Sequence, residues 1–329
     1  MAKDGLPMHH APSSQIRVGA VLKRFRRLLR PVYLRFADAL PASWHVKLEY
    51  FRAHGRWPNL SHPQKFNEKI AWRKLCERDA RLPGLSDKIQ AKRIVGAKFG
   101  YDLINPTLAV YSNANEMDFT KLPLSAPPYV IKANHGSGMN IFVRDEPINQ
   151  SAIRERVDKW MKIDHSSIME EWAYSRIKPR ILIEPDMGDT ARLTDYKFHV
   201  FSGSVYAIEV VLDRFGDYRI NFYNPDWIPL EIKRYANRPP SDAPVAPPNR
   251  LADMLKLAEA IGSEFSYVRV DLYEIDGRIR FGELTFYTGA ANDRFEPDEW
   301  DLRFGQQWVC ELPKNVPEEK TVCEFAATV

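Results

Sequence analysis

The stretch PYVIKANHGSGMNIFVRD, which runs from Pro128 to Asp145, contains two apolar runs joined by a small polar loop. The first run ends near Lys132, and the loop contains Gly136, Ser137 and Gly138. Apolar runs on both sides of a short glycine-containing loop predict a β-hairpin. A lysine at a strand end and the backbone N–H groups of such a loop can bind phosphate. The stretch therefore predicts either a phosphate-binding hairpin or an ordinary one.

Two details restrict the phosphate interpretation. Gly138 is followed by Met139, not by Gly-Lys-Ser/Thr, so the loop is not a P-loop of the Walker A type. His135 stands at the start of the loop. Its side chain either contacts a phosphate or caps the turn.

The composition is that of an ordinary globular protein. The 329 residues are 44% hydrophobic and 27% charged, which at this length predicts two or three packed lobes. Cys76, Cys310 and Cys323 are far apart and lack a metal-binding spacing, so we expect reduced thiols. No uncharged apolar run reaches the roughly 18–20 residues of a membrane span, and the N-terminus lacks the apolar core of a signal peptide. We expect a cytoplasmic protein.

The net charge of +4 is unevenly distributed. Residues 1–60 contain 11 Lys and Arg but only three Asp and Glu. Within them, residues 16–40 place basic and apolar side chains at helical spacing. This segment is either a basic amphipathic helix that binds the inner face of a membrane or an anionic glycan, or a helix packed on its own domain. Because no aromatic stacking platform accompanies the basic residues, we expect no nucleic-acid partner.

The remaining pattern predicts helices followed by antiparallel hairpins. Residues 1–15 read as disordered and 224–249 as a proline-rich loop. We expect helices at 16–40, at 62–100 with a break at Pro83–Gly84 and a cap at Ser86 or Asp87, at 151–176 and at 251–262. Strands are expected within 101–111, 128–145, 180–187, 195–216 and 265–286.

The last hairpin, FSYVRVDLYEIDGRIRFGELTF (265–286), carries charged residues with strand spacing. A two-residue turn at Asp276–Gly277 pairs the strands so that residue numbers sum to about 553. Asp271 and Glu283 then lie side by side, within reach of one Mg²⁺ ion, which prefers oxygen ligands. Arg269 shares a face with Asp271, and Thr285 with Glu283. The alternative is a solvated strand face with ordinary ion pairs.

Three more lysines are candidates for anion binding. Lys197 lies within DYKFHVF (195–201), and a lysine that faces inward from a strand usually has an anionic partner. Lys88 and Lys92 lie one turn apart on a predicted helix and share a face. Spacing alone favours a solvated pair for these two.

The order and spacing of these motifs resemble the ATP-grasp superfamily. The motifs are DKIQAKRIVGAKFGYDLINP, YVIKANHGSG, ILIEPDM, DYKFHVF and RVDLY with GELTFYTGA. FNEKIAWRKL, DYKFHVFSG and GELTFYTGA look more closely like the TupA-like ATP-grasp family, which is found among polysaccharide-biosynthesis genes. The likeness covers residues 60–310. It implies an α+β fold in which two α+β lobes clasp ATP, preceded here by a helical N-terminal region.

The resemblance implies a nucleotide site in the first lobe. Lys132 and Lys92 resemble the lysines that contact the phosphates of ATP. His135 to Gly138 resemble the loop that closes over them. ILIEPDM resembles the adenine hinge, with Glu184 near the amino group, and Asp189 is a candidate for a ribose contact.

The resemblance also assigns roles in the second lobe. Lys197 resembles the residue that reaches the γ-phosphate, and Arg269 the arginine that stabilises the acyl-phosphate transition state. Asp271 and Glu283 resemble the carboxylates that bind Mg²⁺, with Mn²⁺ as an alternative ion. Thr285 stands where the superfamily usually has a metal-binding asparagine, which weakens that contact.

The function that the resemblance implies is an ATP-dependent ligase that joins a carboxylate to an amine through an acyl phosphate. Its substrates would be a carboxylate-bearing sugar or polymer of the bacterial surface and an amine such as an amino acid. Two alternatives are a glycosyltransferase of polysaccharide biosynthesis and a binding module that does not turn over ATP. The expected domains are a disordered start at 1–15, a basic arm at 16–60, a helical region at 61–111, lobes at 112–187 and 188–312, and a tail at 313–329.

Overall fold

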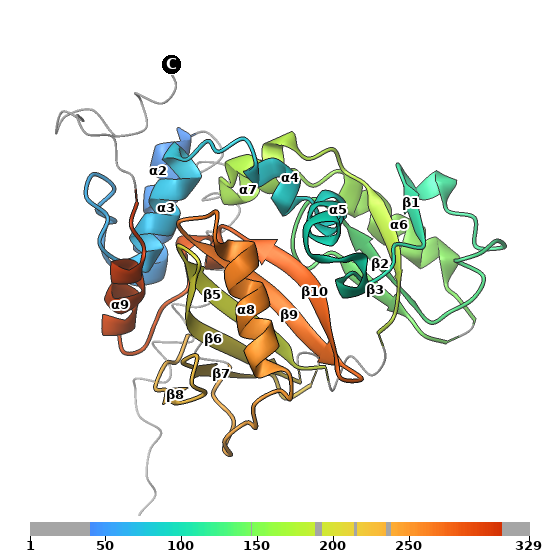
Figure 1. Ribbon diagram of the computed structural model, residues 1–329. Helices are drawn as coiled ribbons and strands as arrows, with labels where there is room; N and C mark the ends of the chain where they lie inside the picture. Colours follow the sequence, from blue (N-terminus) through green and yellow to red (C-terminus); the bar gives the residue numbers. More distant parts are fainter. Residues whose placement is uncertain (1–39, 146, 188–192, 214–215, 235–237, 311–329) are drawn as a thin grey trace, which may run out of the picture. The chain divides into compact units, whose positions relative to one another are not determined.

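A computed structural model describes residues 40–145, 147–187, 193–213, 216–234 and 238–310 (Figure 1). The chain divides into two units, Met1–His45 and Val46–Val329, and the description below concerns the second. Apart from Leu40, the segments predicted to be disordered at 1–15 and helical at 16–40 lie outside the described residues. Within the described ranges, no helix is both long enough and apolar enough to cross a membrane.

The hairpin of Pro128–Asp145 belongs to the first sheet and is confirmed. Its strands pair in antiparallel register with Lys132 opposite Asn140. On the other side, Ile131 lies opposite Ile183, and both side chains are fully buried. The sheet has the order β1-β4-β2-β3, with β1 (Ala109–Tyr111), β4 (Ile181–Pro185), β2 (Tyr129–Ala133) and β3 (Asn140–Val143).

The second sheet is larger and is antiparallel throughout. Its two predicted hairpins are confirmed, and Asp276 and Gly277 form the predicted turn with φ values of 50° and 69°. The strand order is β10-β9-β5-β6-β7-β8. The strands are β5 (Asp195–Phe201), β6 (Ser204–Leu212), β7 (Arg219–Tyr223), β8 (Pro229–Leu230), β9 (Val268–Ile275) and β10 (Arg278–Thr285).

Helices cover both faces of the six-stranded sheet. The predicted α8 (Leu251–Gly262) crosses one face (Figure 1), where Met254 and Ala258 pack in one cluster with Val270. On the other face, α3 (Phe66–Cys76) places the fully buried Phe66 edge-on to Tyr267, with ring centroids 4.9 Å apart. The unpredicted α9 (Glu299–Gln307) packs beside α3.

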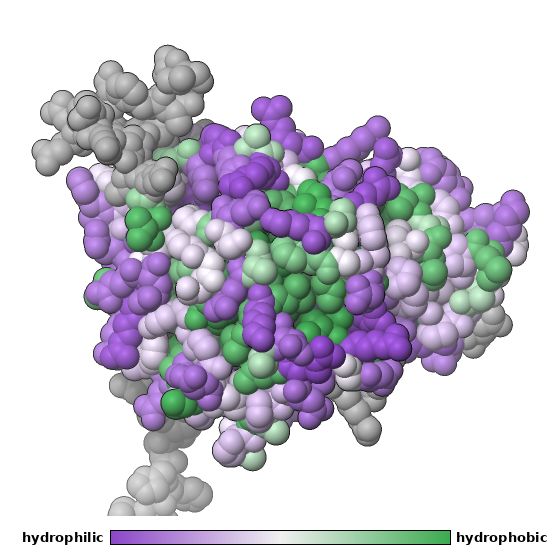
Figure 2. Space-filling model, in the orientation of Figure 1, coloured by the Kyte–Doolittle hydropathy of each residue, from purple (hydrophilic) through white to green (hydrophobic). Residues whose placement is uncertain are grey.

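Helix α5 (Lys88–Phe99) connects the two sheets. Asp87 caps it by accepting hydrogen bonds from two backbone N–H groups, as one of the two predicted caps. Val95 packs in one cluster with Phe281 of β10, and Figure 2 shows hydrophobic side chains gathered over α5 and β10. The other helical segments are α2 (Ala42–His54), α4 (Leu82–Ser86), α6 (Gln150–Met161), α7 (His165–Met169), η1 (Tyr101–Leu103), η2 (Ala114–Glu116), η3 (Trp172–Arg176) and η4 (Thr288–Ala291).

Several local expectations are wrong. The break expected at Pro83–Gly84 lies at 77–81 instead, because Pro83 is tolerated in the first turn of α4. The short strand β8 lies within the expected loop at 224–249. The helix predicted at 151–176 is interrupted because Asp164 caps a new helix, α7, through the N–H groups of Ser166 and Ser167. Strand β7 lies where no element was predicted. The thiol of Cys310 is free, but Cys76 is disulfide-bonded, so the expectation of reduced thiols fails at Cys76.

Candidate functional site

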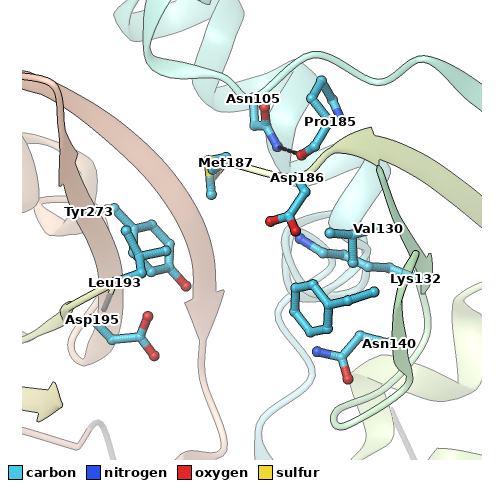
Figure 3. Close-up of a pocket in the computed structure, with 11 residues that line it drawn as sticks. Asn105, Val130, Lys132, Asn140, Pro185, Asp186, Met187, Leu193, Asp195 and Tyr273 are labelled. Atoms are coloured by element: carbon cyan, nitrogen blue, oxygen red, sulfur yellow. Dashed lines mark hydrogen bonds between the residues drawn. The ribbon is translucent and has the colours of Figure 1, made fainter. Parts of the chain in front are cut away.

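A cleft lies between the two sheets and is lined by residues from both. Figure 3 shows Val130, Lys132 and Asn140 on one wall, facing Tyr273 and Leu193 on the other. The cleft comprises two adjoining cavities of about 90 and 130 Å³. Both cavities are lined by Asn105, Lys132, Asn140, Met187 and Tyr273.

Lys92 and Lys132 meet at one buried carboxylate. Lys132 Nζ lies 2.7 Å from Glu184 Oε2, and Lys92 bonds the other carboxylate oxygen and the Asn105 carbonyl. The Glu184 side chain is only 3% exposed. Burial opposes its ionisation, but the two lysines outweigh burial and keep the pKa of Glu184 below its usual value. The structure thus brings both lysines that were predicted to bind phosphate to one wall of the cleft. Glu184 already balances part of their charge.

The chain after Glu184 borders the apolar part of the cleft. The Glu184 carboxylate bonds Lys92 and Lys132. The groups that border this part of the cleft therefore come from the residues that follow it, Pro185 to Met187. The Pro185 carbonyl accepts a hydrogen bond from Asn105 Nδ2 at 3.2 Å (Figure 3). Val130 and Met187 supply apolar surface there. Asp189, the predicted ribose contact, lies outside the described residues.

The loop after β2 divides into an outward and an inward part. Ser137 and Gly138 are exposed and line the cleft. The ring of His135 is 3% exposed and contacts the Trp160 carbonyl at 3.1 Å, so it anchors the loop and does not enter the cleft. A Cβ at Gly136 would lie 2.4 Å from Met139 Cε, the flexible end of that side chain, and 3.1 Å from His165 Nδ1.

A β-bulge sets the register of the last hairpin. Near the turn, paired residue numbers sum to 553, as predicted. Between Phe281 and Glu283 the register shifts by one residue, which places Glu283 directly opposite Asp271. The same shift places Thr285 opposite Arg269. The predicted neighbours are therefore cross-strand partners, and Gly282 takes up the extra residue.

The three predicted metal ligands differ in their surroundings. Asp271 is 1% exposed and accepts hydrogen bonds from Arg269 Nε at 2.7 Å and Lys197 Nζ at 2.7 Å. Thr285 Oγ1 accepts from Arg269 Nη2 at 3.0 Å. Of these side chains, Glu283 is the one that lines the cleft, with a side chain 40% exposed.

This arrangement suits a metal ion that is bound mainly through its substrate. In the part of the chain that the structure describes, no group of three or more His, Cys, Asp or Glu residues could hold a metal by itself. Mg²⁺ commonly uses one or two carboxylates together with phosphate oxygens and water. Glu283, backed by Asp271, fits that mode, whereas a site built wholly from protein ligands does not fit.

A buried polar layer that includes Glu209 and Arg234, which were not predicted, lies next to Lys197 and Arg269 on the same sheet. Glu209, which pairs with Lys197 across β5 and β6, accepts a hydrogen bond from Arg234 Nη1 at 2.7 Å. His199 Nε2 lies 3.6 Å from the same carboxylate. The alternation of charged and apolar residues in DYKFHVF and YAIEVVL was the available signal, because it points His199 and Glu209 to the face of Lys197.

The free energy of unfolding should depend on pH through His199 of this layer. Burial lowers the pKa of His199 to about 4, below its value in the unfolded chain, so unfolding takes up a proton between the two values. We expect the free energy of unfolding to fall as the pH drops from 6.5 toward 4. His199→Gln should reduce that slope by up to about 1.4 kcal/mol per pH unit.

Urea denaturation at several pH values would measure the slope. His62→Gln is the control, because His62 is exposed and its loss should leave the slope unchanged. Equal slopes for wild type and His199→Gln would contradict the assignment of His199 as a buried neutral residue.

Lys88 is a second residue that the site contains and that spacing alone did not favour. It lines the cleft beside Lys92. Its Nζ donates a hydrogen bond to the Gly136 carbonyl at 2.6 Å and lies 3.8 Å from Glu283 Oε2. The predicted solvated pair is therefore wrong, since Lys88 and Lys92 both point into the cleft region.

Several solved structures resemble this one at low sequence identity. D-alanine–D-alanine ligase from Bacillus anthracis complexed with ATP has a TM-score of 0.40 and 13% identity, covering 74% of this chain and 68% of that chain. The ATP-grasp ligase PsnB complexed with minimal precursor has a TM-score of 0.38 and 11% identity, covering 69% and 62%. D-alanine–D-alanine ligase from Helicobacter pylori has a TM-score of 0.39 and 13% identity, covering 76% and 68%.

The comparison with sequence families identifies the family of this chain. A search of curated protein sequences gives no significant match. Residues 68–309 match the family described as TupA-like ATPgrasp, and this range contains the α5 lysines, both sheets and every described site residue named above. The predicted α+β ATP-grasp fold is confirmed. The chain belongs to the TupA-like ATP-grasp family.

Proposed function

We propose that this protein is an ATP-dependent ligase that joins a carboxylate to an amine through an acyl phosphate. The observation that carries the proposal is the charge distribution around the cleft. Lys92 and Lys132 stand on one wall, and the Lys197–Asp271–Arg269 cluster stands on the opposing sheet. The cluster reaches the cleft through Glu283, since Arg269 Nη2 lies 3.6 Å from Glu283 Oε1. Lysines on one side of a cleft and a carboxylate backed by cations on the other suit a polyphosphate with its metal ion, whose terminal group is transferred.

On this proposal, the first lobe binds the nucleotide. Lys92 and Lys132 contact its phosphates, and the backbone of Ser137 and Gly138 covers them. Val130 and Met187 contact the base, and the chain after Glu184 supplies hydrogen bonds to its edge. We retain Asp189 as the proposed ribose contact.

The second lobe would hold the metal and the reacting groups. Glu283, with Asp271 behind it and Thr285 as a weaker oxygen donor, would hold Mg²⁺ or Mn²⁺ against the phosphates, where the ion neutralises charge. Burial alone would lower the pKa of Arg269, but Asp271 outweighs it and raises that pKa well above its usual value. Arg269 therefore remains cationic and, with Lys197 beside it on Asp271, can stabilise charge on the transferred phosphoryl group.

No nucleophilic side chain is needed for this chemistry. A carboxylate resists attack because its leaving group would be oxide. Transfer of the γ-phosphoryl group to a carboxylate oxygen forms a mixed anhydride and ADP. The amine then attacks the acyl carbon, phosphate leaves, and the amine loses a proton. The enzyme contributes mainly positioning and neutralisation of charge.

The substrates and the cellular setting are proposed on the family resemblance. The acid would be a uronic-acid sugar or a carboxylate-bearing surface polymer, the amine an amino acid, and the setting capsule, exopolysaccharide or teichuronopeptide-like biosynthesis. The basic segment at 16–60 would bind an anionic glycan or the inner face of the membrane. We propose the lobes as 112–187 and 188–312, although β1 already begins at Ala109.

A thermal shift experiment tests the nucleotide site. Mg–ATP at about 100 times its dissociation constant should stabilise the wild type by about 2.7 kcal/mol. Lys132→Met should weaken ATP binding by about 10- to 100-fold, because a charge-assisted hydrogen bond to phosphate contributes about 1.5–3 kcal/mol. Lys121→Met is the control, since Lys121 is 78% exposed and remote from the cleft lining.

The outcomes separate the proposed function from its rivals. A Mg–ATP shift that Lys132→Met loses, followed by ADP release with a uronic acid and an amino acid, supports the ligase. A shift without ADP release for any acid would favour a binding module, which the pairing of Asp271 with Arg269 and Lys197 makes a specific alternative. A shift with a nucleotide sugar but not with ATP would overturn the proposal.

A further inference from the structure

Lys88 links three parts of the cleft that belong to different elements. It stands on the first turn of α5, and Val95 farther along the same helix packs in one cluster with residues of the second sheet. Its Nζ donates to the Gly136 carbonyl in the loop after β2, and it lies 3.8 Å from Glu283 Oε2 on β10. One ammonium group therefore bonds the loop that would cover the phosphates and lies near the carboxylate that would hold the metal.

We propose that Lys88 is a latch that competes with the divalent cation for Glu283. Before nucleotide binds, its ammonium balances the charge of Glu283 together with Arg269, whose Nη2 lies 3.6 Å from Glu283 Oε1, and it ties Gly136 to the second lobe. When Glu283 takes up the metal, the divalent ion repels the nearby ammonium, so the Lys88 side chain moves away from Glu283 toward the phosphates. This inference rests on the proposed role of Glu283, and it makes Lys88 a positioning residue that couples metal binding to the loop.

The loop after β2 is anchored at its base and exposed at its tip, so a single contact between these parts can affect the position of the tip. Its base is anchored, because the Lys88 N–H donates to the Asn134 carbonyl and Asn134 Nδ2 donates to Asp87. Gly136 is tightly packed against Met139 and His165. Beyond it, Ser137 and Gly138 are exposed, and Gly138 has a positive φ of 70° around which a Cβ would meet nothing. Exposure is therefore confined to the tip, and Lys88 holds Gly136, the residue just before it.

The Lys88 side chain is more exposed than that of Lys92, which leaves its ammonium room to move. Lys92 is 8% exposed and is fixed by Glu184 and the Asn105 carbonyl. Lys88 is 23% exposed, and its distance to Glu283 is longer than a hydrogen bond. Such a pair is held by charge rather than by directional bonding, so a stronger cation can displace it.

The test measures metal binding and loop protection without turnover. Lys88→Met should bind Mn²⁺ at least about threefold more tightly than wild type in electron paramagnetic resonance titrations without nucleotide, because one of the two cations near Glu283 is removed and only Arg269 remains. In the same samples, amide hydrogen exchange at residues 136–138 should be at least about tenfold faster, since the tie to Gly136 is lost. Lys88→Arg, which retains the charge, should keep the Mn²⁺ affinity of wild type.

Lys98→Met is the matched control, because Lys98 lies on the same helix but is 51% exposed and pairs with Glu264 at 2.6 Å. It should change neither quantity. Unchanged Mn²⁺ affinity in Lys88→Met would overturn the competition and leave Lys88 a structural tie. Absence of Mn²⁺ binding in both proteins would also overturn it. In either case the Mg–ATP shift of the wild type would persist, whereas failure of the proposed function would abolish that shift.

Discussion

Lysine in place of Arg269 should lower ADP formation by about 10²- to 10³-fold, the effect of removing one preorganised donor to a developing charge. Arg269 holds Asp271 with a forked pair of hydrogen bonds, Nε to Oδ1 at 2.7 Å and Nη2 to Oδ2 at 2.8 Å, and Nη2 also reaches Thr285. A lysine retains the charge but cannot reproduce the fork. The charge near Asp271 is kept, so the variant should fold and bind Mg–ATP with about the affinity of wild type.

The assay is ADP release at saturating Mg–ATP with glucuronic acid and an amino acid mixture, beside the thermal shift with Mg–ATP alone. Arg280→Lys is the matched control, since Arg280 lies in the same hairpin and bonds the Asp102 carbonyl, away from the charged cluster. A rate within about threefold of wild type for Arg269→Lys would show that this arginine does not face the reacting group, against the expected loss.

The second large effect concerns stability. Replacing Arg234 with methionine should lower the free energy of unfolding by about 3–5 kcal/mol, because it leaves a buried carboxylate without its cation. Arg234 is 3% exposed and pairs with Glu209 at 2.7 Å and with Asp293 at 2.7 Å. Arg234 is the cation that hydrogen-bonds Glu209, because the nearby His199 is neutral at pH 7, since burial lowers its pKa to about 4.

Urea denaturation at pH 7 measures this loss. Arg250→Met is the control, because Arg250 and its partner Asp253 are both about half exposed, and such a pair contributes at most about 1 kcal/mol. The double variant Arg234→Met, Glu209→Gln should recover part of the stability, since the uncompensated charge is then absent. A loss for Arg234→Met as small as that of the control would mean that water reaches Glu209.

Local sequence patterns predicted much of the fold. Alternating apolar residues on either side of Gly-containing turns identified the hairpins at 128–145 and 265–286, because strand periodicity and turn chemistry are local properties. The helix at 251–262 was evident for the same reason. The interruption at Asp164 was not evident, because a cap competes with helix continuation by a small energy that neighbouring contacts decide.

Residue type and order also identified the candidate site. Lys132, Arg269, Asp271 and Glu283 were selected because chemistry that binds phosphate and Mg²⁺ requires these side chains. The sequence could not show that Asp271 is occupied by Arg269 and Lys197, while Glu283 alone of the predicted ligands lines the cleft.

What the sequence by itself determined is therefore the set of elements, the family and the residue types of the site. Tertiary structure decided their pairing. The bulge at Gly282 moves Glu283 opposite Asp271, and packing of α5 against both sheets brings Lys92 to Glu184 and Lys88 to Glu283. Strand and helix periodicities act over a few residues, whereas these contacts join positions about 90 to 195 apart in the chain. The free energy that selects them comes from burial and charge compensation in the folded protein, which no single segment contains.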